Sequence, residues 1–210
     1  MICLVEALRY RCIRYIKKDL GNFHILVGPN ASGKSTFLDV ISFLGDIVRE
    51  GLESAVRKRT PNYIDLMWLK EGNTFELAVE MKIPDRYKRV IERTGNCRYE
   101  IAIGKLPETV EFGILSETMW FKPHGKIEKR QLQLFPSPQD PPETIVVSGR
   151  RRYWKKVVNK VKGGNDNFYA EIKGFDHAFK LGPQKSALAN LPEDESKFPV
   201  ATWLKRTLLQ

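Results

Sequence analysis

The segment Gly28-Pro29-Asn30-Ala31-Ser32-Gly33-Lys34-Ser35-Thr36 constrains this chain more than any other. It fits G-x-x-x-x-G-K-[ST], the pattern of a phosphate-binding loop. The apolar run of residues 23–27 precedes it and is predicted to be a buried strand. Apolar residues then recur at three- and four-residue steps, which predicts a helix from about Ser35 to residue 49 or 50, with Gly51 at its end. A strand, a glycine-rich turn and a helix in this order favour a phosphate site over a chance turn.

Each residue type in this loop has a physical role. Gly28 and Gly33 let the backbone turn tightly and come close to an anion. The N–H groups between them and the positive end of the following helix attract negative charge. Lys34 reaches the β- and γ-phosphates as a point charge and is the candidate catalytic residue. The Ser35 hydroxyl can take one position on Mg²⁺ and is the candidate metal ligand.

Composition sets the class of protein. The 210 residues suit one domain, or a domain with a smaller subdomain. No stretch approaches the roughly 18 apolar residues of a membrane span, and the N-terminus lacks the basic head of a signal peptide. We therefore expect no contact with a membrane. Cys3, Cys12 and Cys97 are odd in number and have no CxxC spacing, so we expect neither disulfides nor zinc, and a reducing cytoplasm. The formal charge of +10 is compatible with a nucleic-acid partner, and equally with a basic nucleotide-binding protein or a missing acidic segment.

Strand patterns lie on both sides of the loop. Residues 2–10 are predicted to be a strand, and residues 75–83 alternate apolar and polar side chains. The alternation predicts a half-buried antiparallel strand with Glu80 on its solvent-facing side. Residues 98–103 and 110–115 continue the pattern. We expect these strands to form a sheet separate from the phosphate-loop layer.

Two basic regions are candidates for nucleic-acid contact. Arg57-Lys58-Arg59 is more simply explained as a solvated charge run. Residues 150–173 carry eight Lys or Arg against two acidic residues and predict a basic β-hairpin. Its aromatic side chains can stack on bases, but an edge hairpin whose lysines prevent aggregation fits equally well. The candidate residues are Arg57, Arg59, Arg150, Arg151, Arg152, Lys155 and Lys156.

The groups that hydrolyse ATP are not evident. Hydrolysis needs a second carboxylate to hold Mg²⁺ and a group that orients the attacking water. In most P-loop proteins an apolar strand ending in Asp supplies that carboxylate, and no such strand follows Thr36. Asp65, Glu80 and Glu117 lack this context. The sequence therefore predicts the binding half of an ATPase without its hydrolytic half.

The loop and its surroundings resemble the ABC-type heads of the RecF, SMC and Rad50 group. The resemblance includes Leu8-Arg9-Tyr10 and a turn before the loop, and Phe37-Leu38-Asp39-Val40-Ile41 after it. The segment is most similar to the bacterial AAA-type ATPases found in genome-defence and overcoming-lysogenisation systems. The resemblance is specific over residues 1–50 and looser over 75–121. It implies an α/β fold, the N-terminal lobe of an ABC-type P-loop NTPase with an antiparallel β subdomain.

The resemblance also implies roles for single residues. ATP and Mg²⁺ are the implied cofactors, bound by Gly28, Asn30, Ala31, Ser32, Gly33, Lys34, Ser35 and Thr36, with Thr36 on the α-phosphate. Arg9 or Arg11 is expected near the nucleotide, and Arg57 or Arg59 stands about where SMC-like heads sense DNA. The signature loop, the Walker B Asp-Glu pair and the switch histidine of these heads are missing, and Gln131 and Gln133 are the candidates for their Q-loop glutamine.

Together these patterns divide the chain into four parts. Residues 1–60 are expected to be the nucleotide-binding core, 61–135 the antiparallel subdomain, 136–149 a Pro-rich connection, and 150–210 a basic hairpin and a C-terminal helix that continue into a missing ATPase lobe. The expected function is Mg-ATP binding and, with that lobe or with a second copy in a homodimer, ATP hydrolysis in DNA repair or phage defence. The alternatives are a non-hydrolysing, nucleotide-dependent nucleic-acid-binding module and, less favoured, a P-loop kinase.

Overall fold

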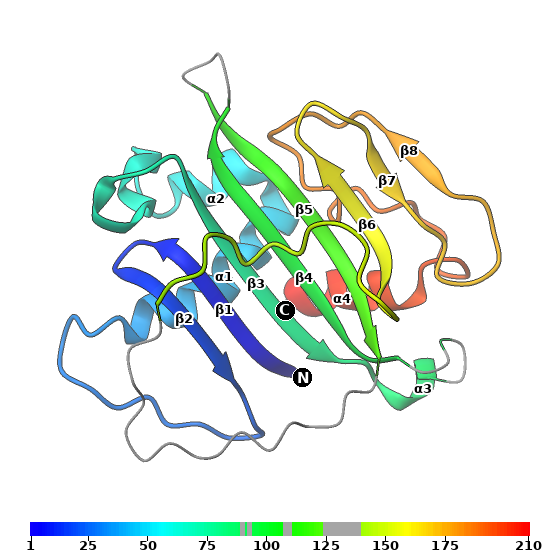
Figure 1. Ribbon diagram of the computed structural model, residues 1–210, viewed down its shortest axis with the longest axis horizontal. Coiled ribbons are helices and arrows are strands. Elements are labelled where there is room, and N and C mark those ends of the chain that lie inside the picture. The colour runs from blue at the N-terminus through cyan, green and yellow to red at the C-terminus, as the bar shows by residue number, and fades with distance from the viewer. Residues whose placement is uncertain (89–90, 92–93, 107–110, 124–139) are drawn as a thin grey trace.

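A computed structural model of the chain describes residues 1–88, 91, 94–106, 111–123 and 140–210. In these residues the strands form one antiparallel sheet, in the order β2-β1-β3-β4-β5-β6-β7-β8 (Figure 1). The strands are β1 (Ile2–Tyr10), β2 (Ile13–Asp19), β3 (Thr74–Lys82), β4 (Thr94–Lys105), β5 (Phe112–Pro123), β6 (Lys155–Val161), β7 (Asp166–Phe168) and β8 (His177–Phe179).

Helices cover one face of this sheet. The α-helices are α1 (Lys34–Glu50), α2 (Leu52–Arg57), α3 (Asp85–Lys88) and α4 (Pro199–Leu208), and two 3₁₀ turns are η1 (Tyr63–Leu66) and η2 (Trp68–Lys70). Figure 1 shows α1, α2 and α4 behind the sheet, while residues 140–149 cross its front face. We call residues 140–149 the strap.

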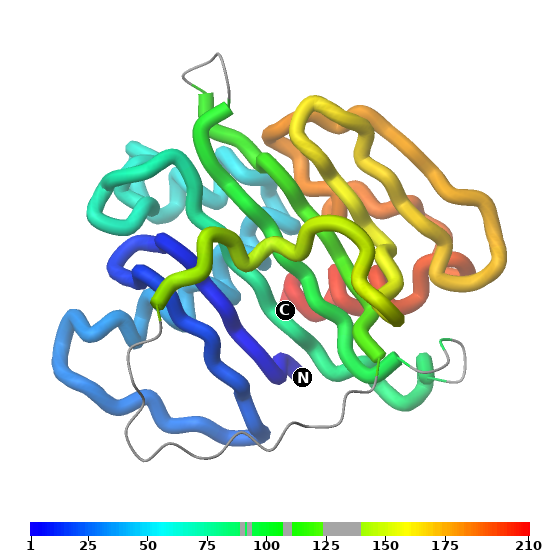
Figure 2. The backbone as a smooth tube through the Cα atoms, viewed as in Figure 1, coloured from blue at the N-terminus to red at the C-terminus, as the bar shows by residue number. Residues whose placement is uncertain are grey.

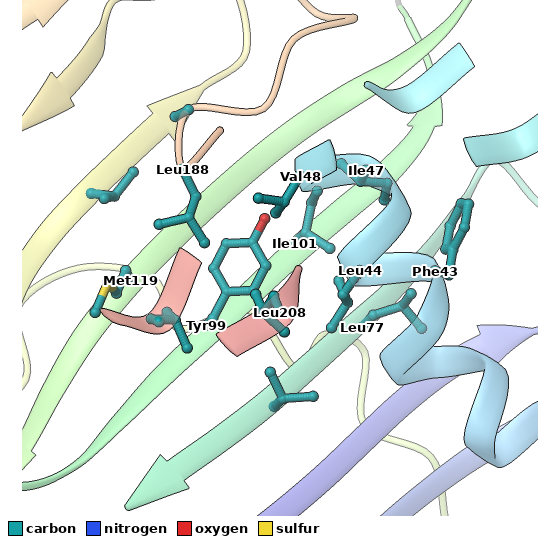
Figure 3. Packing of buried hydrophobic residues seen from close by; sticks show 14 of the residues in the cluster. Phe43, Leu44, Ile47, Val48, Leu77, Tyr99, Ile101, Met119, Leu188 and Leu208 are labelled. Carbon is teal, nitrogen blue, oxygen red and sulfur yellow. The ribbon is translucent and has the colours of Figure 1, made fainter. Parts of the chain in front are cut away.

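The main core lies between the helices and the sheet. Apolar residues at three- and four-residue steps give α1 one buried stripe, which packs on alternate residues of β3, β4 and β5. The fully buried residues shown in Figure 3 include Phe43, Leu44 and Ile47 of α1, with Leu77, Tyr99, Ile101 and Met119 of the strands. Full burial of one such aliphatic or Phe side chain contributes about 1.5–3 kcal/mol, so this layer is the main stabilising element.

The opposite face of the sheet carries buried charged side chains, which are paired with one another and with the strap. Glu76 of β3 accepts hydrogen bonds from the strap, including one of 2.6 Å from the Ile145 N–H. Glu100 of β4 accepts another, of 2.8 Å, from the Val147 N–H. Glu80 is only 5% exposed and accepts a hydrogen bond of 2.6 Å from Lys122. The expectation that Glu80 faces solvent is therefore wrong, because the strap and neighbouring cations cover the polar face.

Three further sequence expectations meet a clear outcome. The helix after the loop is confirmed, and Gly51 ends it with a positive φ of 86°. The strands of the described residues do not form a sheet separate from the nucleotide-binding part, because β1 pairs with both β2 and β3. The predicted buried strand at residues 23–27 is also wrong, since this run is irregular and exposed along the open loop between β2 and α1 (Figure 2).

Candidate nucleotide-binding site

The phosphate loop joins this open segment to the first turn of α1. Its backbone needs glycine at two places. A Cβ on Gly28 would lie 2.9 Å from the Ser32 hydroxyl oxygen, and Gly33 has φ +90° beside the Cys12 sulfur. Ala31 also has a positive φ, of 61°. Such turns aim successive N–H groups into a concavity, and the first N–H groups of α1 lack partners within the helix.

Lys34 closes the loop on itself. Its ammonium group donates hydrogen bonds of 2.7 Å to the carbonyl oxygens of Gly28 and Pro29, and one of 3.3 Å to the Ser32 hydroxyl. These acceptors are exposed, so exchanging them for phosphate oxygens requires no buried bond to break. Lys34 is therefore positioned at the loop as a mobile cation that an anion can recruit.

A cavity of about 550 Å³ opens at this loop. This volume lies within the roughly 300–1,000 Å³ of small-molecule sites. Residues from the β1–β2 turn, the loop and the η1–η2 segment line it together: Arg11, Cys12, Asn30, Ala31, Ser32, Gly33, Lys34, Ser35, Thr36, Asp65, Met67, Leu69 and Lys70. The cavity thus brings together every predicted loop residue except Gly28, and it includes Arg11, one of the two arginines expected near the nucleotide.

The donor set fits a nucleoside triphosphate. The glycine turn leaves room for backbone N–H groups to approach an anion, and Arg11, Lys34 and Lys70 bring three cations to the cavity. Ser35 offers a hydroxyl for Mg²⁺. The described residues contain no cluster of three or more His, Cys, Asp or Glu side chains able to hold a metal ion by themselves. The protein residues found here therefore suit a metal that arrives with phosphate oxygens.

A partly buried ionic network holds Arg11 and α1 in place. Asp39 of α1 accepts hydrogen bonds of 2.6 Å from Tyr10 and 3.2 Å from Arg11, and it pairs with Arg59 at 2.7 Å. Burial opposes the ionisation of Asp39, but these hydrogen bonds outweigh it and hold the pKa of the carboxyl below its usual value. The network links the turn that carries Arg11 to the helix that begins at Lys34.

The same network changes the interpretation of the Arg57–Arg59 region. The Arg59 side chain is 8% exposed, pairs with Asp39 and Asp46, and lies over the Phe43 ring. This placement argues against a DNA-sensing role for Arg59. Arg57 is exposed on α2 and pairs with Glu53 one turn earlier.

The basic hairpin forms as predicted, from β6 and β7. Arg150, Arg151 and Arg152 are exposed before it. Lys155 donates to the Glu171 carbonyl, and Lys156 lies over the Trp120 ring. The hairpin's aromatic side chains were expected to be able to stack on bases, and for Phe168 this is wrong, because its side chain is fully buried.

The carboxylates considered for hydrolysis lie in different places. Asp65 lines the cavity, whereas Glu117 is fully buried on β5 and accepts hydrogen bonds from Tyr99, from Ser186 and from the Leu188 N–H. Gln131, Gln133 and the prolines at 136 and 138 lie outside the described residues. Sequence reasoning missed Cys12, Met67, Leu69 and Lys70, because no motif marks these residues.

A family comparison matches the part of the chain that contains the phosphate loop. Residues 23–96 match the family model described as "AAA domain, putative AbiEii toxin, Type IV TA system". No curated protein matches the sequence. One similar solved structure comes from work on the ATP-driven dimerization and DNA-stimulated activation of SMC ATPases, with 18% identity and a TM-score of 0.41 over 58% of this chain and 69% of that one.

The family match covers the loop, α1, α2 and β3, and it leaves β1 and β2 outside. Over residues 23–96, about a third of the chain, the sequence is therefore similar to an AAA-type ATPase domain, in agreement with the phosphate-loop motif. None of the helices in the described ranges has the length and apolar character that crossing a membrane requires.

Proposed function

We propose that this chain binds Mg-ATP at the loop Gly28–Thr36 and hydrolyses it only together with a partner lobe or a second copy. One observation carries the proposal: seven consecutive loop residues, Asn30–Thr36, line a single cavity with Arg11 beside them. Binding a triphosphate with its metal requires three things, and this loop offers each: a cradle of N–H groups, the ammonium group of Lys34 and the hydroxyl group of Ser35.

The chain's own residues have distinct tasks in this proposal. Mg-ATP, when bound, supplies the γ-phosphoryl group and the metal that neutralises its charge. Lys34 would exchange its hydrogen bonds to the Gly28 and Pro29 carbonyl oxygens for phosphate oxygens, and the Ser35 hydroxyl would be a ligand of the metal. Arg11, held by Asp39, adds a fixed positive charge at the cavity rim.

Two observations support an incomplete catalytic site. Asp65 is the sole carboxylate among the described residues that line the cavity, so these residues do not supply both a metal-holding carboxylate and a separate base. The run before the loop leaves Phe23, Ile25 and Val27 exposed by 80%, 73% and 87%. An apolar run of this kind suits a surface that a partner covers. We propose that the partner contributes the missing carboxylate and base, in a process that acts on DNA in repair or genome defence.

The test is nucleotide binding and turnover by the purified chain. Isothermal titration calorimetry should show that Lys34→Ala weakens Mg-ATP binding at least about tenfold, because the variant has no ammonium group to donate to the phosphate oxygens. The matched control is Lys162→Ala, an exposed lysine in the turn after β6. Equal affinity in all three proteins would refute the binding site. Phosphate release that is abolished in Lys34→Ala, and whose rate per chain does not rise with the concentration of the chain, would refute the need for a partner lobe or a second copy.

A second candidate function is nucleotide-dependent binding of nucleic acid without hydrolysis. Arg150, Arg151 and Arg152 favour it, because they are consecutive and exposed. Changing all three to Ala should weaken DNA or RNA binding and flatten its salt dependence, by about 0.7–0.9 in log–log slope for each phosphate that is no longer neutralised. Lys155 and Lys156 are expected to contribute less, since they already contact Glu171 and Trp120. Unchanged binding in the triple variant would remove this candidate.

A further inference from the structure

The wall of the cavity opposite the phosphate loop is a short, firmly anchored segment, η1–η2. Tyr63 stacks on Phe112 of β5 with ring centroids 4.3 Å apart, and Leu66 is buried. The Leu66 carbonyl accepts a hydrogen bond of 2.8 Å from the Arg11 N–H, and Met67 bridges to Tyr10. The segment is therefore fixed to the same turn that carries Arg11.

The end of this segment has an unusual backbone. Leu69 has φ 53° and Lys70 has φ 59°, two consecutive non-glycine residues in the left-handed region. Such conformations cost energy and occur preferentially at functional sites. Here the conformation leaves Leu69 63% exposed beside the cavity instead of packed in the core.

The chemistry of this wall differs from that of the phosphate loop. Asp65 accepts hydrogen bonds of 2.7 Å from the Thr60 hydroxyl and 2.8 Å from the Lys70 ammonium. Its hydrogen bonds to Lys70 and Thr60 lower the pKa of its carboxyl, so it is ionised at neutral pH. A carboxylate repels phosphate but accepts readily from hydroxyl groups, since each oxygen can accept more than one hydrogen bond. An exposed leucine next to it offers an apolar surface for a flat ring.

We propose that the η1–η2 segment binds the nucleoside half of the nucleotide, with Asp65 accepting from the ribose hydroxyls and Leu69 packing against the base. The inference rests on the proposed nucleotide site, because it assigns the triphosphate to the loop and the nucleoside to the facing wall. It makes Asp65 a specificity-determining residue and distinguishes it from a metal ligand.

The test compares ATP, 2′-deoxy-ATP and inorganic tripolyphosphate as ligands, by calorimetry with and without Mg²⁺. Leu69→Gly removes the side chain and suits the positive φ, so the backbone is preserved. Leu69→Gly and Asp65→Ala should each weaken ATP binding about tenfold. Tripolyphosphate binding should stay within about twofold of the wild type in Leu69→Gly, and in Asp65→Ala it should be unchanged or tighter, because that change removes a negative charge from the cavity and releases Lys70. The wild-type preference for ATP over 2′-deoxy-ATP should disappear in Asp65→Ala, with and without Mg²⁺.

Other outcomes separate the two proposals. If neither variant alters ATP binding, or if both ligands weaken equally, the nucleoside site is refuted while the phosphate site stands. An effect of Asp65→Ala seen only with Mg²⁺ would make Asp65 a metal ligand and also refute the inference. If the wild-type chain binds neither ATP nor tripolyphosphate, or if Lys34→Ala binds both as well as the wild type, the proposed function itself fails. Cooperative urea unfolding of both variants, with midpoints within about 0.5 M of the wild type, establishes that they are folded.

Discussion

Replacing Arg98 by methionine tests how the polar face of the sheet is stabilised. Arg98 is 4% exposed in β4 and pairs with Glu100 at 2.6 Å, Glu6 at 2.9 Å and Glu80 at 3.4 Å. It also donates a hydrogen bond of 2.9 Å to the Ile145 carbonyl of the strap. Methionine keeps the apolar stem of the side chain and removes its charge, so the change isolates the ionic contribution.

The magnitude follows from what each carboxylate retains. Removing one member of a buried ion pair costs about 3–5 kcal/mol, because a buried charge loses its partner. Glu80 keeps Lys122 at 2.6 Å, and Glu100 keeps the Trp120 ring N–H at 2.9 Å. Glu6 keeps the Tyr15 hydroxyl at 3.0 Å. Since no carboxylate is left without a hydrogen bond, we expect a loss of free energy of unfolding near the lower limit, about 3 kcal/mol.

Urea unfolding at pH 7 measures this loss. The control is Arg57→Met, an exposed arginine paired with Glu53 along α2, which should cost no more than about 0.5 kcal/mol. Adding Glu100→Gln to Arg98→Met should recover part of the loss, because the charge left behind is then removed. A loss below about 1 kcal/mol, or no recovery in the double variant, would show that the carboxylates do not depend on Arg98.

Three further predictions concern single residues. Burial raises the pKa of the Glu171 carboxyl to about 7, although the carboxylate accepts hydrogen bonds from two N–H groups at the start of α4. The free energy of unfolding should therefore fall by up to about 3 kcal/mol from pH 4.5 to 7, because the folded protein keeps a proton that the unfolded chain loses. Glu171→Gln should flatten this part of a pH series of urea midpoints. Cys12 is exposed in the cavity while the other two cysteines are less accessible, so maleimide should label it first and ATP should slow the labelling; equal rates with ATP would place the nucleotide elsewhere. Gly45→Ala should destabilise the protein by about 1–3 kcal/mol despite alanine's helix preference, because its Cβ would lie 2.5 Å from the Leu208 carbonyl oxygen; a higher thermal midpoint would contradict this.

The sequence was sufficient to predict the elements whose structure depends only on residues that are near one another in the chain. The spacing of apolar residues and Gly51 predicted α1, and strict alternation predicted β3. The glycines and Lys34 marked the phosphate loop, because their roles depend only on neighbours in the chain.

Features that depend on distant residues were not predictable. Alternation separates two faces of a strand but does not say what covers each, and Glu80 is covered by Lys122 and Arg98 from other strands. The cavity wall at Leu69 and Lys70 carries no motif, since neither residue is a glycine even though both have positive φ. The likeness to a phosphate-binding ATPase therefore identified one wall of the site, and the structure was needed for the other.

The exposed run at residues 23–27 is the point where nucleotide and partner are expected to meet. Covering Phe23, Ile25 and Val27 would gain about 1.5–3 kcal/mol for each side chain, while ordering five residues of backbone costs about 1–2 kcal/mol each. The two totals nearly cancel, so a partner gains little from this run unless something else orders it first. The run leads directly into Gly28, and a bound triphosphate would fix the loop that follows. We therefore expect ATP to slow amide hydrogen exchange at residues 23–27 in the wild type and not in Lys34→Ala; equal exchange in both proteins would show that nucleotide does not prepare this run for a partner.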